Sequence, residues 1–138
     1  MEVVYWDASA IVSALFKDKY SDRAQEWANK EGVHLVSTLA YAETCAVCAR
    51  MKKQHLVANV LSKAAVDVLN NGPWYRLTAY PEWGLIESLA EKWSLRGADL
   101  WHLATAKSLQ EQLSELVILT FDVHLKNAAG GEGMTANL

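Results

Sequence analysis

The chain has 138 residues, of which 51% are hydrophobic and 21% are charged, and its formal net charge is −3. This length and composition fit a single globular domain over residues 1–138, able to bury roughly two thirds of the surface of its unfolded chain. The net negative charge argues against a simple polycationic nucleic-acid binder, but it is compatible with an enzyme that reaches nucleic acid through a metal.

Apolar runs and helical patterns alternate along the chain, which is typical of a parallel sheet whose strands are joined by helices. In chain order we predict a strand at 3–6, helices at 9–16 and 21–30, a strand at 33–37, helices at 39–53 and 55–69, a strand at 74–80, helices at 81–95 and 99–113, a strand at 116–121 and a short helix at 123–129. The run LVILTF at 116–121 is the clearest fully buried strand. The expected fold class is α/β with a central, mainly parallel sheet.

No apolar stretch approaches the length of about 18 residues that a membrane span needs. The first residues, MEVVYWD, lack the basic segment and the long apolar segment of a signal peptide. We therefore expect a cytoplasmic protein that does not associate with membranes.

Four acidic residues lie inside or at the ends of apolar runs: Asp7, Glu43, Asp99 and Asp122. A carboxylate in such surroundings either loses its water, at a cost of several kcal/mol, or lies near a cation. Asp7 and Asp122 each follow a predicted strand directly, so two strand ends could bring both carboxylates into one crevice. Glu43 and Asp99 could join them from the first turns of two helices.

A cluster of carboxylate oxygens suits Mg²⁺ or Mn²⁺, which prefer oxygen ligands and retained water. One or two such ions can activate water and orient a phosphodiester, so the pattern favours metal-assisted hydrolysis. Each acid taken alone also has a purely structural interpretation. Asp7 could lie in a helix cap formed by Ser9, and Asp122 could cap the last helix. Glu43 and Asp99 could be solvated residues favoured by helix dipoles.

Cys45 and Cys48 form a CxxC spacing, for which a zinc site would need two further ligands. The four histidines are scattered singly along the chain, and both cysteines lie inside a run that already predicts a helix. We therefore expect the two cysteines to pack as small hydrophobic residues.

Four segments of the sequence resemble the signature blocks of PIN-domain ribonucleases. These segments are YWDASAIVSALF, YAETCAV, LRGADLWHLATA and ILTFD. The third is the most specific, because it is close to the family's pattern A-D-x-x-H-L-A-T-A. The resemblance covers roughly residues 3 to 128, and the small size and the block spacing favour the VapC-like toxin branch.

The resemblance implies a metal-dependent endoribonuclease on a three-layer α/β/α sandwich. Ser9 would support the metal ligands or position water, and Thr120 would support Asp122. The toxin branch further implies an RNA substrate, a cognate antitoxin that masks the site, and a homodimer. Carried over by position, the acidic quartet that would coordinate Mg²⁺ or Mn²⁺ is Asp7, Glu43, Asp99 and Asp122.

Three features beside the quartet have alternative interpretations. His102 is predicted to be a packed, hydrogen-bonded side chain, with a part in catalysis as the alternative. The basic cluster of Arg50, Lys52 and Lys53 could be solvated surface or could contact RNA phosphates. The family often ends with another apolar strand, whereas this chain ends in GGEGMTANL, so either the sheet lacks that edge strand or residues 134–138 supply a weak one.

Other functions also remain to be weighed against the ribonuclease toxin. A phospho-acceptor receiver domain would need paired acids after the first strand and a lysine after the last, where this chain has Tyr5, Trp6 and Asp122. A PIN-like scaffold with weak or no activity would not need a working metal site. A PIN-like nuclease could also process RNA without being a toxin.

Overall fold

The computed structural model describes residues 2–137. Within this range the strands form one sheet in the order β3-β2-β1-β4, and each neighbouring pair of strands is parallel. The α/β class with a parallel sheet is therefore confirmed. In chain order the elements are β1 (Glu2–Trp6), α1 (Ala8–Leu15), α2 (Ser21–Ala28), β2 (Gly32–Ser37), α3 (Thr38–Lys53), α4 (Asn59–Asn71), β3 (Trp74–Leu77), α5 (Trp83–Lys92), α6 (Gly97–Gln110), β4 (Leu116–Leu119) and α7 (Val123–Gly131).

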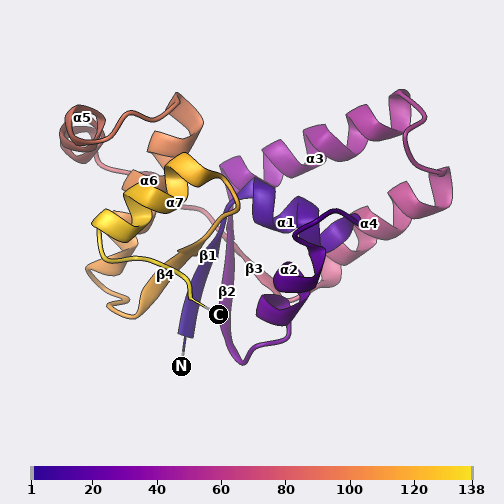
Figure 1. Ribbon diagram of the computed structural model, residues 1–138, viewed down its shortest axis with the longest axis horizontal. Coiled ribbons are helices and arrows are strands. Elements are labelled where there is room, and N and C mark those ends of the chain that lie inside the picture. Colours follow the sequence, from indigo (N-terminus) through magenta and orange to yellow (C-terminus); the bar gives the residue numbers. More distant parts are fainter. Residues whose placement is uncertain (1, 138) are drawn as a thin grey trace.

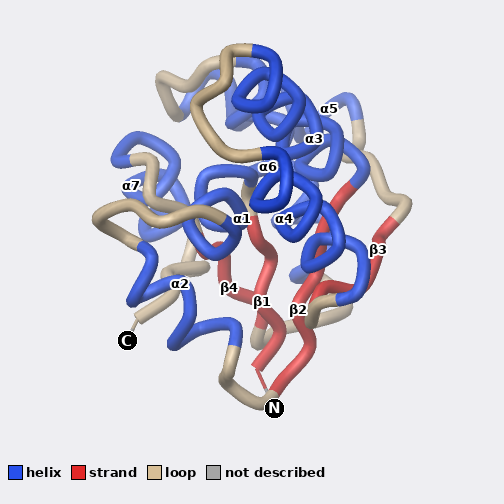
Figure 2. The backbone as a smooth tube through the Cα atoms, turned by 90° about the vertical axis from the view of Figure 1, so that its right-hand side faces the viewer, coloured by secondary structure: helices blue, strands red, loops and turns tan. Residues whose placement is uncertain are grey.

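Helices cover both faces of the sheet, with α1 to α4 on one face and α5 to α7 on the other (Figure 1). Successive side chains of a strand point to opposite faces, and β1 follows this rule. Val3 and Tyr5 pack in the core beneath α5 to α7, whereas Val4 and Trp6 pack in the core beneath α1 to α4. Figure 2 shows the strands side by side from a second direction. The predicted three-layer α/β/α sandwich is confirmed.

The strand order reverses between β1 and β4. The chain moves outward from β1 to β2 and β3, and it then returns to place β4 on the free side of β1. In an open parallel sheet, such a reversal leaves a crevice outside the carboxyl ends of the two strands. Asp7 follows β1 directly and Asp122 lies three residues after the end of β4, so both acids lie at this crevice.

Several predicted boundaries are wrong for identifiable reasons. The helix expected from His55 begins only at Asn59, because His55 adopts a φ of 54° in the turn after α3. The strand expected at 74–80 ends at Leu77, whose partner Ser37 is the last residue of β2, so later residues have no strand beside them. The strand expected at 116–121 ends at Leu119, because the chain turns there toward the end of β1.

The C-terminal segment contributes a single bridge at the edge of the sheet. Ile118 donates its backbone N–H to the carbonyl oxygen of Met134 at 2.9 Å, and it pairs in parallel with Thr135. Met134 itself is fully buried. Of the two possibilities for residues 134–138, the described part of the segment thus forms the weak edge, and residue 138 lies outside the described range.

The two cysteines lie on α3 as free thiols, with Cys48 buried and Cys45 partly buried. Burial raises the pKa of the Cys48 thiol, and the neighbouring Cys45 raises it further. A thiol with a raised pKa is a poor nucleophile, which agrees with the predicted packing role. Among residues 2–137, no helix is both long enough and apolar enough to span a bilayer.

Candidate active site

Asp7 ends β1 and caps α1, and three donors hold its carboxylate. Its Oδ1 accepts the backbone N–H of Ala10 at 2.9 Å and the hydroxyl of Ser9 at 2.7 Å. Its Oδ2 accepts the hydroxyl of Thr120 at 2.5 Å. The residue is 4% exposed, and this burial raises the pKa of Asp7 even though the hydrogen bonds favour the charged form. Asp7 itself is therefore the cap, and not Ser9 as the structural interpretation supposed.

Ser9 and Thr120 join the end of β1 to the segment that follows β4. The Phe121 N–H donates to Ser9 Oγ at 3.0 Å, and the Asp122 N–H donates to Thr120 Oγ1 at 3.0 Å. Thr120 thus supports the backbone of Asp122, as the resemblance implied, and also the side chain of Asp7. These contacts fix the positions of the two strand-end acids relative to each other.

Asp122 is the N-cap of α7, as its structural interpretation proposed. Its Oδ2 accepts the backbone N–H of Leu125 at 2.9 Å. Capping occupies one carboxylate oxygen and leaves Oδ1 without a hydrogen bond from the rest of the described chain. Capping by Asp122 therefore does not prevent this acid from binding a ligand.

Glu43 is held by a buried chain of hydrogen bonds that begins at Tyr5. Burial raises the pKa of Tyr5, so its hydroxyl stays protonated and can donate to His102 Nδ1, 2.6 Å away. The other ring nitrogen of His102 then carries the proton and donates to Glu43 Oε1 at 2.7 Å. His102 is 1% exposed, so the predicted packed, hydrogen-bonded histidine is confirmed.

Asp99 enters the same region from the first turn of α6. Its pKa is raised, first by burial and then by the negative charges of Asp122 and Glu43, against the opposing effects of His102 and Arg96. Asp99 also accepts no hydrogen bond from residues 2–137. The pKa of Asp99 is thus raised by its burial and by the acids nearby, and His102 and Arg96 offset this rise only in part.

Two hollows flank Asp122. The Tyr20 ring stacks on Phe121 in one of them, with ring centroids 4.6 Å apart. That hollow has a volume of about 460 Å³ and extends past Ala8 and Ser9. The other is a cleft of about 490 Å³ lined by Ser94, Leu95, Arg96, Asp99, Asp122 and His124. Asp122 borders both hollows, and Asp99 borders the second.

The acids fit a divalent metal by chemistry, although they are not gathered around a single point. Over residues 2–137, no group of three Asp, Glu, His or Cys side chains is arranged to hold an ion. Glu43 Oε2 and Asp122 Oδ1 are nevertheless free of hydrogen bonds within this range, as are both oxygens of Asp99. Carboxylate oxygens without hydrogen bonds are the donors that Mg²⁺ and Mn²⁺ prefer.

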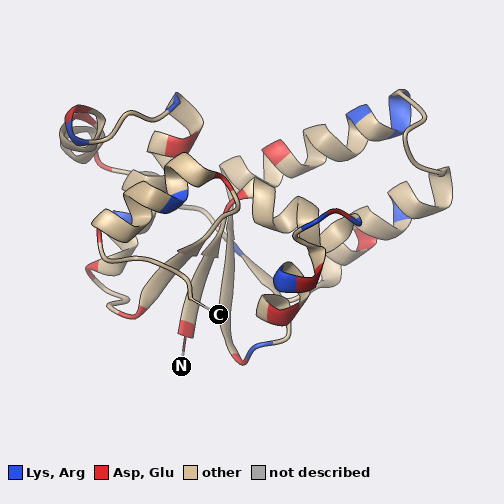
Figure 3. Cartoon of the chain, in the orientation of Figure 1, with Lys and Arg blue, Asp and Glu red and all other residues tan. Residues whose placement is uncertain are grey.

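The basic cluster lies far from these acids. Arg50, Lys52 and Lys53 occupy the last turn of α3, and Figure 3 shows basic residues at the end of that helix that projects away from the sheet. The side chains that line the cleft with Asp99 are instead Arg96 and His124. No sequence pattern indicates a role for His124, because a single histidine in the first turn of a short helix has no diagnostic spacing.

Comparison with known proteins identifies the family of this chain and relates its fold to solved structures. The sequence matches the PIN domain family model over residues 4–131. The chain belongs to the PIN domain family. No curated protein sequence is significantly similar to this PIN domain.

Two crystal structures share the fold of this PIN domain. VapC20 of Mycobacterium tuberculosis, described as a sarcin-ricin loop cleaving toxin, has 16% sequence identity and a TM-score of 0.60, over 91% of this chain and 94% of VapC20. PAE2754 of Pyrobaculum aerophilum has 17% identity and a TM-score of 0.63, over 92% of this chain and 79% of that protein. At these identities the likeness establishes the fold, and the four acids of this PIN domain must be judged on their own geometry.

Proposed function

We propose that this PIN domain is a metal-dependent endoribonuclease toxin that hydrolyses RNA phosphodiester bonds. The observation that supports the proposal is the placement of Asp7 and Asp122 at the β1–β4 crevice, together with the raised pKa of Asp99, to which its burial and then the charges of Asp122 and Glu43 contribute. PIN domains are typically nucleases, and the structurally similar VapC20 is described as a toxin that cleaves the sarcin-ricin loop.

The metal ligands in this proposal are Asp7, Glu43, Asp99 and Asp122. Their free oxygens are hard donors. Both cysteines lie on α3 at a separate groove that Lys52 and Lys63 also line, and burial raises the pKa of the Cys48 thiol. When bound, Mg²⁺ or Mn²⁺ would lower the pKa of a water molecule and offset charge on the phosphate. The all-oxygen donor set favours these two ions over zinc.

The protein's own side chains would prepare the site in two ways. Ser9 and Thr120 hold Asp7 in one orientation, so that this ligand needs little reorganisation when the metal binds. His102 donates to Glu43 Oε1 and thereby holds this carboxylate in one orientation. The two hollows beside Asp122 would accept the nucleotides on either side of the scissile bond.

The remaining parts of the proposal concern partners and location. A cognate antitoxin would mask the acids, and the protein would form a homodimer in the cytoplasm. Residues 1–138 would form a single PIN-like domain, without membrane association. These expectations rest on the resemblance to the VapC-like branch, and co-purification of the chain with the product of a neighbouring gene would support them.

RNA cleavage by the purified protein tests the proposal. We expect cleavage with Mg²⁺ or Mn²⁺, none in the presence of a chelator, and loss of both cleavage and growth inhibition in the Asp7→Asn variant. Asp67→Asn is a matched control, since Asp67 lies on α4 away from the crevice. Cleavage that persists with chelator, or growth inhibition that survives Asp7→Asn, would contradict the proposal.

A PIN-like scaffold with weak activity is the second candidate. It is favoured by the fact that no three metal-binding side chains in residues 2–137 are already arranged around an ion. A scaffold would bind Mn²⁺ weakly and would cleave RNA no faster than its Asp99→Asn variant. A nuclease that processes RNA without being a toxin would cleave in the same assay but would not inhibit growth.

A further inference from the structure

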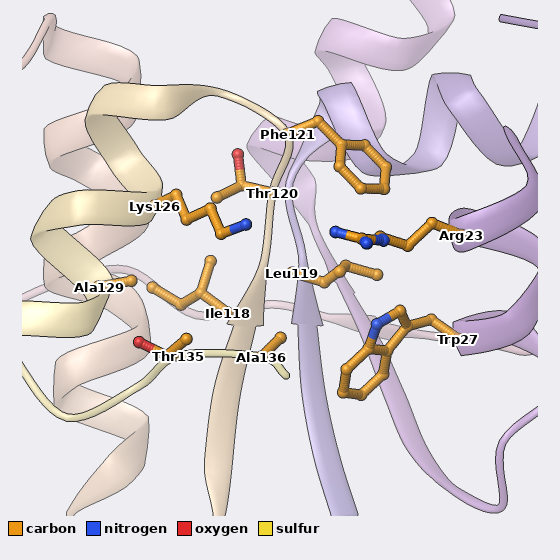
Figure 4. A pocket seen from close by; sticks show the side chains of 10 residues that line it. All are labelled: Arg23, Trp27, Ile118, Leu119, Thr120, Phe121, Lys126, Ala129, Thr135 and Ala136. Carbon is orange, nitrogen blue, oxygen red and sulfur yellow. The ribbon is translucent and has the colours of Figure 1, made fainter. Parts of the chain in front are cut away.

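A small cavity lies beside β4 and is separate from the acidic cleft (Figure 4). Arg23 from α2 and Lys126 from α7 stand on opposite sides of it, and Trp27 from α2 lies below Arg23. The enclosed space measures about 20 Å³, which is enough for one water-sized atom. Residues about a hundred positions apart in the sequence therefore meet at one small hollow.

The cavity is positively charged on both sides. Figure 4 shows the terminal nitrogens of Arg23 and Lys126 turned toward the same gap, and no acidic residue lines it. Neither side chain forms an ion pair or a side-chain hydrogen bond with any residue in the range 2–137. By contrast, Lys92 and Lys107 each pair with Glu132. Two unneutralised cations that face each other favour an anion between them.

Trp27 adds a buried donor that points to the same place. The residue is 1% exposed, and its Nε1–H makes no hydrogen bond within the described chain. Trp6 and Trp93 donate to His34 and Glu132, whereas the enclosed Nε1 of Trp74 also has no partner in the described chain. Figure 4 shows the indole nitrogen of Trp27 on the side of the ring nearest Arg23. This N–H is open to the cavity rather than enclosed, so it can donate to a ligand that enters the cavity.

We propose that Arg23, Lys126 and Trp27 bind one phosphate group of the RNA strand. All three are donors, which is the chemistry that a phosphate oxygen requires. The space of about 20 Å³ would accept one such oxygen, with the rest of the phosphate at the mouth.

The position of the cavity identifies RNA as the source of the phosphate, and this step rests on the proposed function. Thr120 and Phe121 line the cavity, and Asp122 follows them directly. Lys126 lies about one helical turn after Asp122 on α7. A strand that crosses the acids therefore passes the cavity, and it would bring a phosphate near the scissile one within reach of the two cations.

Titration with inorganic phosphate tests the site without relying on cleavage. The probe is the indole N–H signal of Trp27 in a nitrogen-15 NMR spectrum, identified by its loss in Trp27→Phe. We expect millimolar phosphate to shift this signal in the wild type and not in Arg23→Gln or Lys126→Gln. Arg50→Gln, at the far end of α3, is the matched control and should respond as the wild type does.

Binding of a single-stranded RNA in chelator distinguishes the two sources of phosphate. We expect Arg23→Gln and Lys126→Gln each to weaken RNA binding by about 3- to 10-fold, and to lower the slope of log affinity against log salt by about 0.7. If neither phosphate nor RNA shifted the Trp27 signal, the proposed phosphate site would be wrong. A Trp27 response to inorganic phosphate with unchanged RNA affinity would overturn the RNA assignment and indicate a free phosphate instead. Metal-dependent cleavage decides the proposed function separately.

Discussion

The two strand-end acids and the two helix-borne acids are held in different ways. Asp7 and Asp122 cap helices, and Thr120 contacts both. Glu43 has one hydrogen-bond partner, His102, and Asp99 has none among residues 2–137. The strand-end pair therefore has a structural role that would exist without any ligand. Of the helix-borne pair, Glu43 has only its contact with His102, and Asp99 has no hydrogen-bonded role among residues 2–137.

The difference between the two pairs of acids distinguishes residues that contribute to stability from residues that contribute to function. An acid that caps a helix can be retained for folding alone, so its presence says little about catalysis. A partly buried acid without a donor, whose pKa neighbouring acids raise, destabilises the metal-free protein. The raised pKa of Asp99, together with its lack of a hydrogen-bond donor, is thus the structural feature that points most directly to a cation-binding site.

The largest expected effect is on cleavage by Asp99→Asn. If Asp99 is a metal ligand, the variant should cleave RNA at least about a hundredfold more slowly, equivalent to about 2.7 kcal/mol of activation free energy. The metal-free variant should unfold at the same temperature as the wild type or slightly higher, because it removes a repelled charge. A large loss of stability would mean that Asp99 has a structural role that its contacts do not show.

Asp7→Asn should behave in the opposite way in the metal-free protein. An amide NH₂ group cannot accept the Thr120 hydroxyl, so one of the buried hydrogen bonds is lost. We expect the free energy of unfolding to fall by about 1–3 kcal/mol, measured by urea denaturation. Thr120→Val, which removes the donor and keeps the shape, should lose a similar amount. Equal stability of Asp7→Asn and Asp99→Asn would remove the distinction between the two pairs.

The pH dependence of stability should reveal the raised pKa values of Asp7 and Asp99. In the unfolded chain these groups ionise near the ordinary carboxyl pKa of about 4, whereas in the folded chain they hold their protons to a higher pH. The folded state then binds more protons above about pH 4, so the melting temperature of the metal-free protein should fall as the pH rises from there toward neutrality.

Two controls separate this effect from other titrations. Glu132 acts in the opposite direction: burial raises its pKa, but the hydrogen bonds from Lys92 and Trp93 and the charges of Lys92 and Lys107 lower it overall. Glu132→Gln should therefore steepen the fall. Saturating Mn²⁺ should flatten it, since metal binding requires ionised acids. A melting temperature that rises steadily from about pH 4 to neutrality in the Glu132→Gln variant would contradict the raised pKa values.

Tyr5→Phe should give the smallest of these effects. The change removes the donor to His102 Nδ1, so the imidazole proton is no longer fixed on Nε2, where it faces Glu43. We expect about 1 kcal/mol lower stability, a several-fold slower cleavage, and a changed tautomer of His102 in nitrogen-15 NMR. Tyr75→Phe, at a largely exposed position, is the control. An unchanged tautomer would exclude Tyr5 as the residue that orients His102.

The sequence was sufficient for the parts of the molecule that local patterns determine. Apolar runs located the four strands, and their alternation with helices gave the parallel sheet. The four motif blocks gave the family, which the match over residues 4–131 confirms. The placement of Asp7 and Asp122 at strand ends followed from the same patterns, because a strand must end where its apolar run meets a helix cap.

Contacts between residues far apart in the sequence could not be predicted from local patterns. The hydrogen bond from Thr120 to Asp7 joins residues 113 positions apart, and that between Tyr5 and His102 joins residues 97 apart. Such contacts depend on register and side-chain rotamers, which a pattern of residue types does not encode. For the same reason the cavity of Arg23, Lys126 and Trp27 has no signature in the sequence.

Calorimetric titration of Mn²⁺ near neutral pH tests most directly whether the two pairs of acids form one metal site. The samples are the wild type, Asp99→Asn from the helix-borne pair, Asp122→Asn from the strand-end pair, and the control Asp67→Asn. We predict that binding in the wild type and in Asp67→Asn is similar, and that Asp99→Asn and Asp122→Asn each weaken it by about tenfold or more. Mn²⁺ affinity that is equally weak in all four proteins would contradict the account and favour the scaffold.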